Sequence, residues 1–157
     1  MNTLIEKLKA ATGPDRELDA RLWAMEFELD WWEPEEGGTA IKVYDPNNGL
    51  KTLIGFIDPG KESRNFTLIE KGVPEYTASI DAALALAEEV LPPIVGTKSS
   101  DGWGVGLERS RVAGTCGNWL WDAYVRKYAQ DPIEGAHTSP AIAILIALLN
   151  AIQGEQR

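Results

Sequence analysis

The chain has 157 residues, 44% of them hydrophobic, and a formal charge of −9, because 24 acidic residues outnumber 15 basic ones. A chain of this length supports one full hydrophobic core, so we expect a single domain over residues 1–157. The negative charge disfavours duplex nucleic acid as a partner, since that binding depends on neutralising phosphates with lysine and arginine.

The first forty residues predict two short helices and an acidic loop. Leu4, Ile5 and Leu8 share one face of a helix over residues 3–10, which Thr12-Gly13-Pro14 ends. Thr12 or Gly13 can cap a second helix, with Pro14 in its first turn. The apolar stripe of this helix is expected to contain Leu18, Leu22, Met25 and Leu29. Residues 31–38, which include Trp31 and Trp32, then indicate an exposed acidic loop.

The apolar period changes to two at Thr39, which predicts strands. Ile41 and Val43 face one way, and the turn-forming residues 45–49 separate them from a second strand over residues 51–57. Residues 39–57 therefore predict a β-hairpin. Residues 66–69 are a candidate for a short third strand beside it.

Residues 76–81 open a third helix, in which Thr77 or Ser79 is the cap. Ile80, Leu84 and Val90 or Leu91 are expected on its buried side, and Pro92-Pro93 stops it. Residues 103–112 alternate as a strand. Residues 119–128 are most simply the returning strand, although a helix is a fair alternative because Trp119 to Tyr124 lacks β-branched residues. The last helix is capped by Ser139, starts at Pro140, and is apolar on nearly every side until about Ile152.

Three segments carry a family resemblance: residues 4–8 leading into 13–19, residues 76–84, and residues 138–143. Their order and spacing resemble the phage ABA sandwich domain, a group of small phage and prophage proteins, over the whole chain. The resemblance implies an α-β-α sandwich, which agrees with the α+β order of elements derived above: a mainly antiparallel sheet with helices on both faces. It implies no activity, cofactor or catalytic set, and residues 39–71 depart from the pattern as an insertion.

The segment from Trp103 to Lys127 is the preferred region for a ligand site, because it holds three of the six tryptophans and four of the eleven bases that lie beyond residue 36. Strand alternation places Trp103, Arg109 and Arg111 on one face, with Trp119 and Trp121 on the returning segment. Aromatic rings stack nucleobases while a guanidinium grips phosphate, so this mixture suits a nucleotide. The ordinary alternative is that the tryptophans belong to a core or an interface. Gly102, Gly104 and Gly106 only weakly resemble a phosphate loop, because no helix follows them.

Arg16 is a further candidate ligand residue, because it lies at a helix start where anions bind. Its three-residue spacing from Asp19 also permits an ordinary ion pair. His137 and Cys116 are the only histidine and cysteine, and neither has a partner at a recognisable catalytic spacing. We therefore expect no catalytic set, no metal and no cofactor.

Two binding hypotheses from different classes follow from these residues. The first is a non-enzymatic, phage-encoded protein that sequesters a small nucleotide-like immune signal of the host. The second is an acidic protein–protein inhibitor or adaptor, in which Trp31, Trp32 and the acidic loop dock onto a host defence protein. A nucleotide-degrading enzyme is the third and weakest alternative.

The sequence also predicts where the protein acts and in what state. A single cysteine fits a reducing compartment, and acidic residues interrupt residues 1–25, where a secretion signal would need an apolar stretch. The longest apolar run, residues 141–149, is well short of the ~20 residues that span a bilayer. We expect a protein of the host cytoplasm with no membrane contact. Apolar strands and several tryptophans favour a homo-oligomer.

Overall fold

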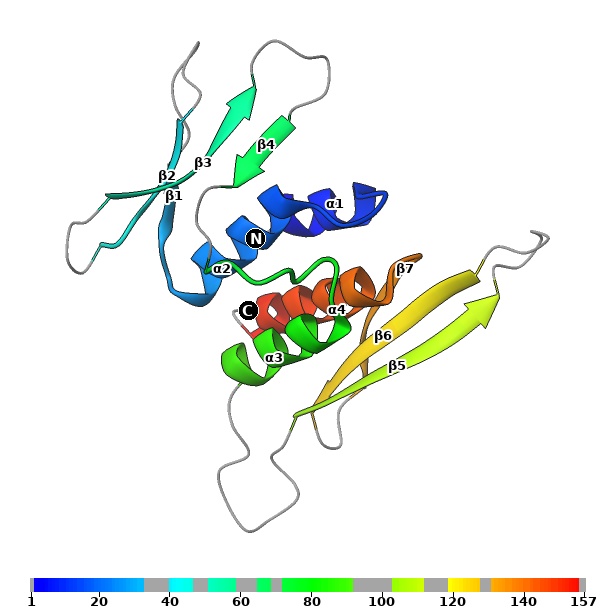
Figure 1. Cartoon of the computed structure of the whole chain (residues 1–157). Coiled ribbons are helices and arrows are strands. Elements are labelled where there is room, and N and C mark those ends of the chain that lie inside the picture. The colour runs from blue at the N-terminus through cyan, green and yellow to red at the C-terminus, as the bar shows by residue number, and fades with distance from the viewer. Residues whose placement is uncertain are drawn as a thin grey trace. The chain divides into compact units, whose positions relative to one another are not determined.

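The computed structural model describes residues 2–32, 40–46, 51–58, 65–68, 72–91, 103–111, 119–127 and 131–155. These residues form four helices and seven strands in two antiparallel sheets (Figure 1). The chain divides into two compact units, residues 15–75 and the remainder. Helices pack against a sheet in each unit, so the predicted α+β class is confirmed. A single domain over residues 1–157 stays a prediction.

The unit formed by residues 1–14 and 76–157 is built around its last helix. Its helices are α1 (Asn2–Ala10), α3 (Ile80–Val90) and α4 (Pro140–Glu155). Its strands β5 (Trp103–Arg111), β6 (Trp119–Lys127) and β7 (Ile133–His137) form an antiparallel sheet in that order. Helix α4 lies against the sheet through β6 and β7, and α1 and α3 pack on α4 (Figure 1).

The all-round apolar character of α4 is explained by this layered arrangement. Residues 141–149 are all buried, because the helix has the sheet on one side and two helices on another. Gly135 of β7 allows the close approach. A Cβ added there would lie 2.4 Å from the backbone nitrogen of Ala147 and 2.5 Å from the carbonyl oxygen of Ala143. The missing side chain therefore sets the distance between sheet and helix.

The unit of residues 15–75 packs one helix on a four-stranded sheet. It contains α2 (Arg16–Glu26), β1 (Asp30–Trp32), β2 (Ala40–Tyr44), β3 (Lys51–Asp58) and β4 (Asn65–Leu68). The strands pair antiparallel in chain order, which confirms the predicted hairpin and the short additional strand. The buried core residues are Ala20, Ala24, Ile41, Val43, Ile54 and Val73. A bulge in the β2–β3 ladder interrupts its register between Ile41 and Lys42.

The ends of α2 differ from the predicted ones. Asp15, and not Thr12 or Gly13, is the N-cap, and its carboxylate accepts hydrogen bonds from the backbone nitrogens of Glu17 and Leu18. A carboxylate is the stronger cap here because it is charged and meets the positive end of the helix dipole. At the other end Glu28 has a φ of 53°, which places a non-glycine residue in the left-handed region.

The turn after α2 is a Schellman motif. The backbone nitrogen of Leu29 donates to the carbonyl of Ala24 at 2.7 Å, and that of Glu28 donates to Met25 at 3.1 Å. Ala24 belongs to the apolar core and Leu29 packs against it, which is the hydrophobic contact that usually accompanies this motif. The helix therefore stops before Leu29, although Leu29 was expected to extend its buried stripe.

Helix α3 begins as predicted, and of the residues expected on its buried side Leu91 is buried and Leu84 is half-buried. Ser79 is the N-cap and accepts a hydrogen bond from the backbone nitrogen of Ala82 at 3.2 Å. The buried helical residues are Ala83, Leu86 and Ala87, whereas Ile80 is exposed. The prediction for Ile80 was wrong because α3 packs on α4 through the adjacent stripe of Ala83, Leu86 and Ala87, whose small alanines allow the two helices to lie close together.

Candidate functional site

Three of the predicted ligand residues meet on one face of the β5–β6 hairpin. Arg109 is directly opposite Trp121 in the strand register, and Arg111 is opposite Trp119. The Cζ atom of Arg109 lies 4.4 Å from the ring centroid of Trp119 and 5.8 Å from that of Trp121. We call Arg109, Trp119 and Trp121 the Arg–Trp surface. The register also confirms that residues 119–127 form a strand and not a helix.

The Arg–Trp surface continues a face that is buried further along the hairpin. Ala123 and Val125 follow Trp121 on the same face of β6 and are fully buried where α4 covers the sheet. Trp121 is half-buried, and Trp119 is 39% exposed. The exposure therefore rises along β6 from Val125 towards Trp119, and Arg109 is itself exposed. The same alternation that buries Ala123 and Val125 therefore places Arg109, Trp119 and Trp121 at the edge of the core.

The remaining members of the predicted set are only partly placed. Trp103 and Arg111 lie in β5, where their register partners are Lys127 and Trp119, and their side chains lie outside the described part of the structure. Cys116 and the predicted acidic loop from residue 33 onward also fall outside the described residues.

The glycines of β5 have a packing role. A Cβ added to Gly106 would lie 2.0 Å from the Cζ atom of Tyr124, its cross-strand partner, so the glycine makes room for that ring. Gly104, in contrast, has no heavy atom within 4 Å of the position of a Cβ. Both glycines belong to a continuous nine-residue strand, which is not the loop that a phosphate-binding motif requires.

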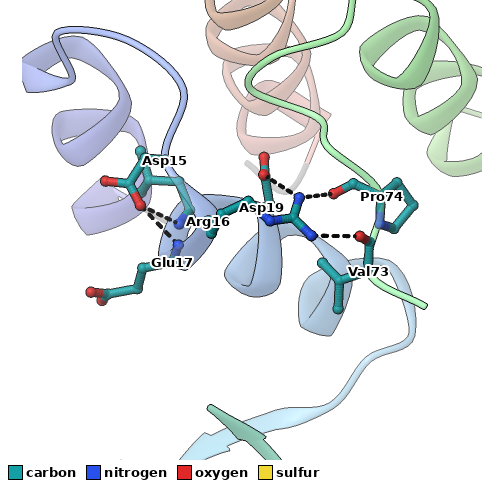
Figure 2. Close-up of polar contacts among 7 residues, drawn as sticks. Asp15, Arg16, Glu17, Asp19, Val73 and Pro74 are labelled. Carbon is teal, nitrogen blue, oxygen red and sulfur yellow. Dashed lines mark hydrogen bonds and ion pairs between the residues drawn. The ribbon is translucent and has the colours of Figure 1, made fainter. Parts of the chain in front are cut away.

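Arg16 lies in the other unit and joins helix α2 to residues 73–74 (Figure 2). Its Nη1 atom donates to Oδ2 of Asp19 at 2.7 Å and to the carbonyl of Pro74 at 3.1 Å, and its Nη2 donates to the carbonyl of Val73 at 2.9 Å. The Asp19 side chain is fully buried. These contacts within its own unit account for the position and charge of Arg16 without a bound anion.

Arg21, a second arginine of α2, contacts Trp31, which the sequence predicted to lie in a loop. Arg21 donates to Oε1 of Glu17 through Nε at 3.0 Å and Nη2 at 2.9 Å, and its Cζ lies 4.3 Å from the ring centroid of Trp31. Trp31 is opposite Val43 in the sheet and packs against Phe66 and the core. The prediction of an exposed loop at residues 31–32 was wrong, because cross-strand pairing turns Trp31 towards the core.

His137 is buried, and both of its ring nitrogens have partners. Nδ1 accepts a hydrogen bond from the backbone nitrogen of Ser139 at 2.9 Å. That bond leaves the proton on Nε2, which lies 2.8 Å from the carbonyl oxygen of Ala11 and donates to it. His137 is also the register partner of Trp121, a proximity that does not follow from the sequence unless β7 is predicted as a strand. The alternation of Ile133, Gly135 and His137 was the available signal.

Comparisons with protein-family models, curated proteins and solved structures found no match to this chain. The resemblance to the phage ABA sandwich domain therefore stays a prediction. Among the residues that the structure describes, no helix combines the length and apolar character needed to cross a bilayer.

Proposed function

We propose that this protein binds a small nucleotide-like molecule on the Arg–Trp surface without changing it chemically. The observation that carries the proposal is the position of Arg109, exposed and lying over Trp119 at 4.4 Å beside Trp121. A guanidinium presents a planar fork of donors that matches phosphate oxygens. The adjacent indoles offer flat apolar area on which a base can stack.

Cross-strand geometry favours this surface as a preorganised site. Arg109, Trp119 and Trp121 lie on paired β-strands, so their backbone positions are fixed by the ladder and not by a loop. The ring contacts hold the guanidinium in place before a ligand arrives, which lowers the entropy lost on binding. The segment is also less acidic than the chain as a whole: residues 101–127 hold four basic and three acidic residues.

His137 supports binding in preference to acid–base catalysis. It is the chain's only histidine, and its two nitrogens are engaged by Ser139 and Ala11. A general base must present a free nitrogen to the substrate, so this histidine is committed to structure. The resemblance to phage proteins favours a counter-defence role, in which the protein sequesters a nucleotide signal in the host cytoplasm.

Calorimetry against a panel of mono-, di- and cyclic nucleotides tests the proposal. At least one member is expected to bind at micromolar concentration and to be recovered unchanged, whereas recovery of a product would favour the enzyme alternative. Arg109→Ala and Trp119→Ala are each expected to weaken binding about 10- to 100-fold, the value of one charged hydrogen bond or one stacked base. Arg126→Ala is the matched control, because Arg126 is exposed on the opposite face of the same hairpin.

Two results would contradict the proposal. One is the absence of micromolar binding across the panel. The other is an equal loss of affinity in the Arg109 variant and in the Arg126 control, which would show that the arginines act only through general charge.

A separate observation favours the second candidate function, a protein–protein adaptor. Leu53 and Phe56 are exposed on β3, and they pair with Lys42 and Ala40 on the sheet face opposite the buried Ile41 and Val43. Exposed apolar side chains on a sheet face are typical of protein interfaces. Trp31 no longer contributes to this candidate, because it packs on the core. Phe56→Ser would test it by reducing binding to a host partner identified by affinity purification.

A further inference from the structure

Strand β5 is an unusually long sheet edge. It pairs with β6 along one side over all nine of its residues, and the sheet order leaves its other side at the edge. The other edge strands, β1, β4 and β7, have three, four and five residues. No described element of its own unit lies alongside the outer edge of β5 (Figure 1). An edge of this length presents a row of backbone donors and acceptors to a further strand.

We infer that β5 pairs with β5 of a second copy of this chain, antiparallel and centred on Leu107. Leu107 then lies opposite Leu107 of the second copy, and each Val105 lies opposite an Arg109. On the other face of the sheet, Gly104 lies opposite Ser110 and Gly106 lies opposite Glu108. Because an antiparallel pair of identical strands has a twofold axis, one contact surface serves both copies.

The length and the charge pattern of β5 together select this register. Centred on Leu107, the pairing uses all nine residues of β5 and places no two like charges opposite each other. Moving the centre to Glu108 places the two Glu108 carboxylates opposite each other, and moving it to Arg109 does the same for the guanidiniums. Like charges directly opposite destabilise an antiparallel pair, so these registers are disfavoured.

The pairing joins two three-stranded sheets into one continuous sheet. The twofold axis stands perpendicular to the sheet, so both Arg–Trp surfaces lie on the same face of the dimer. The pairing goes beyond the proposed ligand binding and does not depend on it. An edge contact of this size belongs to the small interface class, so a reversible dimer with a micromolar dissociation constant is expected.

Sedimentation velocity of the full chain over a concentration series tests the inference with two double variants. Gly104→Glu with Ser110→Glu places glutamates opposite each other twice across the axis. Gly104→Glu with Ser110→Lys places opposite charges at the same positions, and in both double variants residue 104 is a glutamate opposite Arg126 of β6. Both positions lie on the sheet face away from the Arg–Trp surface, and Gly104 has room for a side chain.

The Glu/Glu variant is expected to weaken dimerisation at least about 10-fold, and the Glu/Lys variant to restore it to within about threefold of the wild type. Hydrogen exchange of the wild-type chain gives an independent readout, in which protection of β5 amides rises with protein concentration. A wild-type chain that is monomeric up to about millimolar concentration would overturn the inference. A dimer that the Glu/Glu variant leaves unchanged would overturn it equally. Nucleotide calorimetry on the Glu/Glu variant reports separately on the Arg–Trp surface.

Discussion

The contact of Arg16 with buried Asp19 is the polar interaction whose loss we expect to cost most. Arg16→Met keeps the aliphatic stem and removes the guanidinium, which makes three hydrogen bonds, to Asp19, Pro74 and Val73. The Asp19 carboxylate remains behind with a fully buried side chain. Burial of a charge without its partner is unfavourable, because the carboxylate has lost its hydration as well as its counter-charge.

The magnitude follows from these contacts. Removing one partner of a fully buried ion pair costs about 3–5 kcal/mol. Two facts reduce the expected loss: the Arg16 side chain is 34% exposed, and Asp19 has further interactions within the structure. The charged hydrogen bond contributes about 1.5–3 kcal/mol and each carbonyl bond about 1 kcal/mol or less. We therefore expect Arg16→Met to lower the free energy of unfolding by about 2–4 kcal/mol.

Urea denaturation followed by tryptophan fluorescence measures this loss. The control is Lys9→Met, which removes an ion pair of the same three-residue spacing that is exposed on both sides, and should cost about 0.5 kcal/mol or less. Adding Asp19→Asn to Arg16→Met should recover about 1–2 kcal/mol relative to additivity, because the neutral amide no longer needs a cation. The reasoning fails if Arg16→Met costs no more than the Lys9 control, or if the double variant is additive.

Two backbone positions give further predictions, both measured by the urea midpoint. Gly135→Ala should destabilise the protein by about 1–3 kcal/mol, because its Cβ would overlap the backbone of α4 at Ala143 and Ala147, whereas Gly104→Ala, with open space, should be nearly neutral. An equal effect of the two substitutions would contradict this. Glu28→Gly should raise the free energy of unfolding by about 0.5–1 kcal/mol, since glycine adopts the φ of 53° without steric cost; a lower midpoint would show that the Glu28 side chain outweighs the strain.

Elements with a local periodic signal were predicted well from the sequence. The hairpin over residues 39–57 and the strand at 103–111 follow from alternation, and α4 follows from its Pro140 start and apolar length. Residues 119–127 were ambiguous in isolation, because their aromatic composition suits either structure. Their identity as a strand is fixed by pairing with both β5 and β7, which is a non-local property.

The errors arose where a short segment takes its structure from a distant partner. Strand β1 has only three residues, and Trp31 is strand because it pairs with Val43. Strand β7 was missed because Gly135 interrupts its apolar pattern, and that glycine is required by the approach of α4. The cap of α2 was misplaced because Thr12, Gly13 and Asp15 are all acceptable caps, and the sequence alone does not rank them.

Two arginines, Arg16 and Arg109, show how far a candidate site can be predicted from the sequence. Arg16 and Arg109 both lie near groups that suggest an anion site, and the sequence offered a structural alternative for each. Arg16 donates to a buried carboxylate and two backbone carbonyls, so its charge and geometry are satisfied within its own unit. Arg109 is exposed and lies against indole faces, which orient a guanidinium without consuming its in-plane donors. The two arginines differ in what each guanidinium contacts, and that difference is why we propose Arg109, and not Arg16, as the ligand residue.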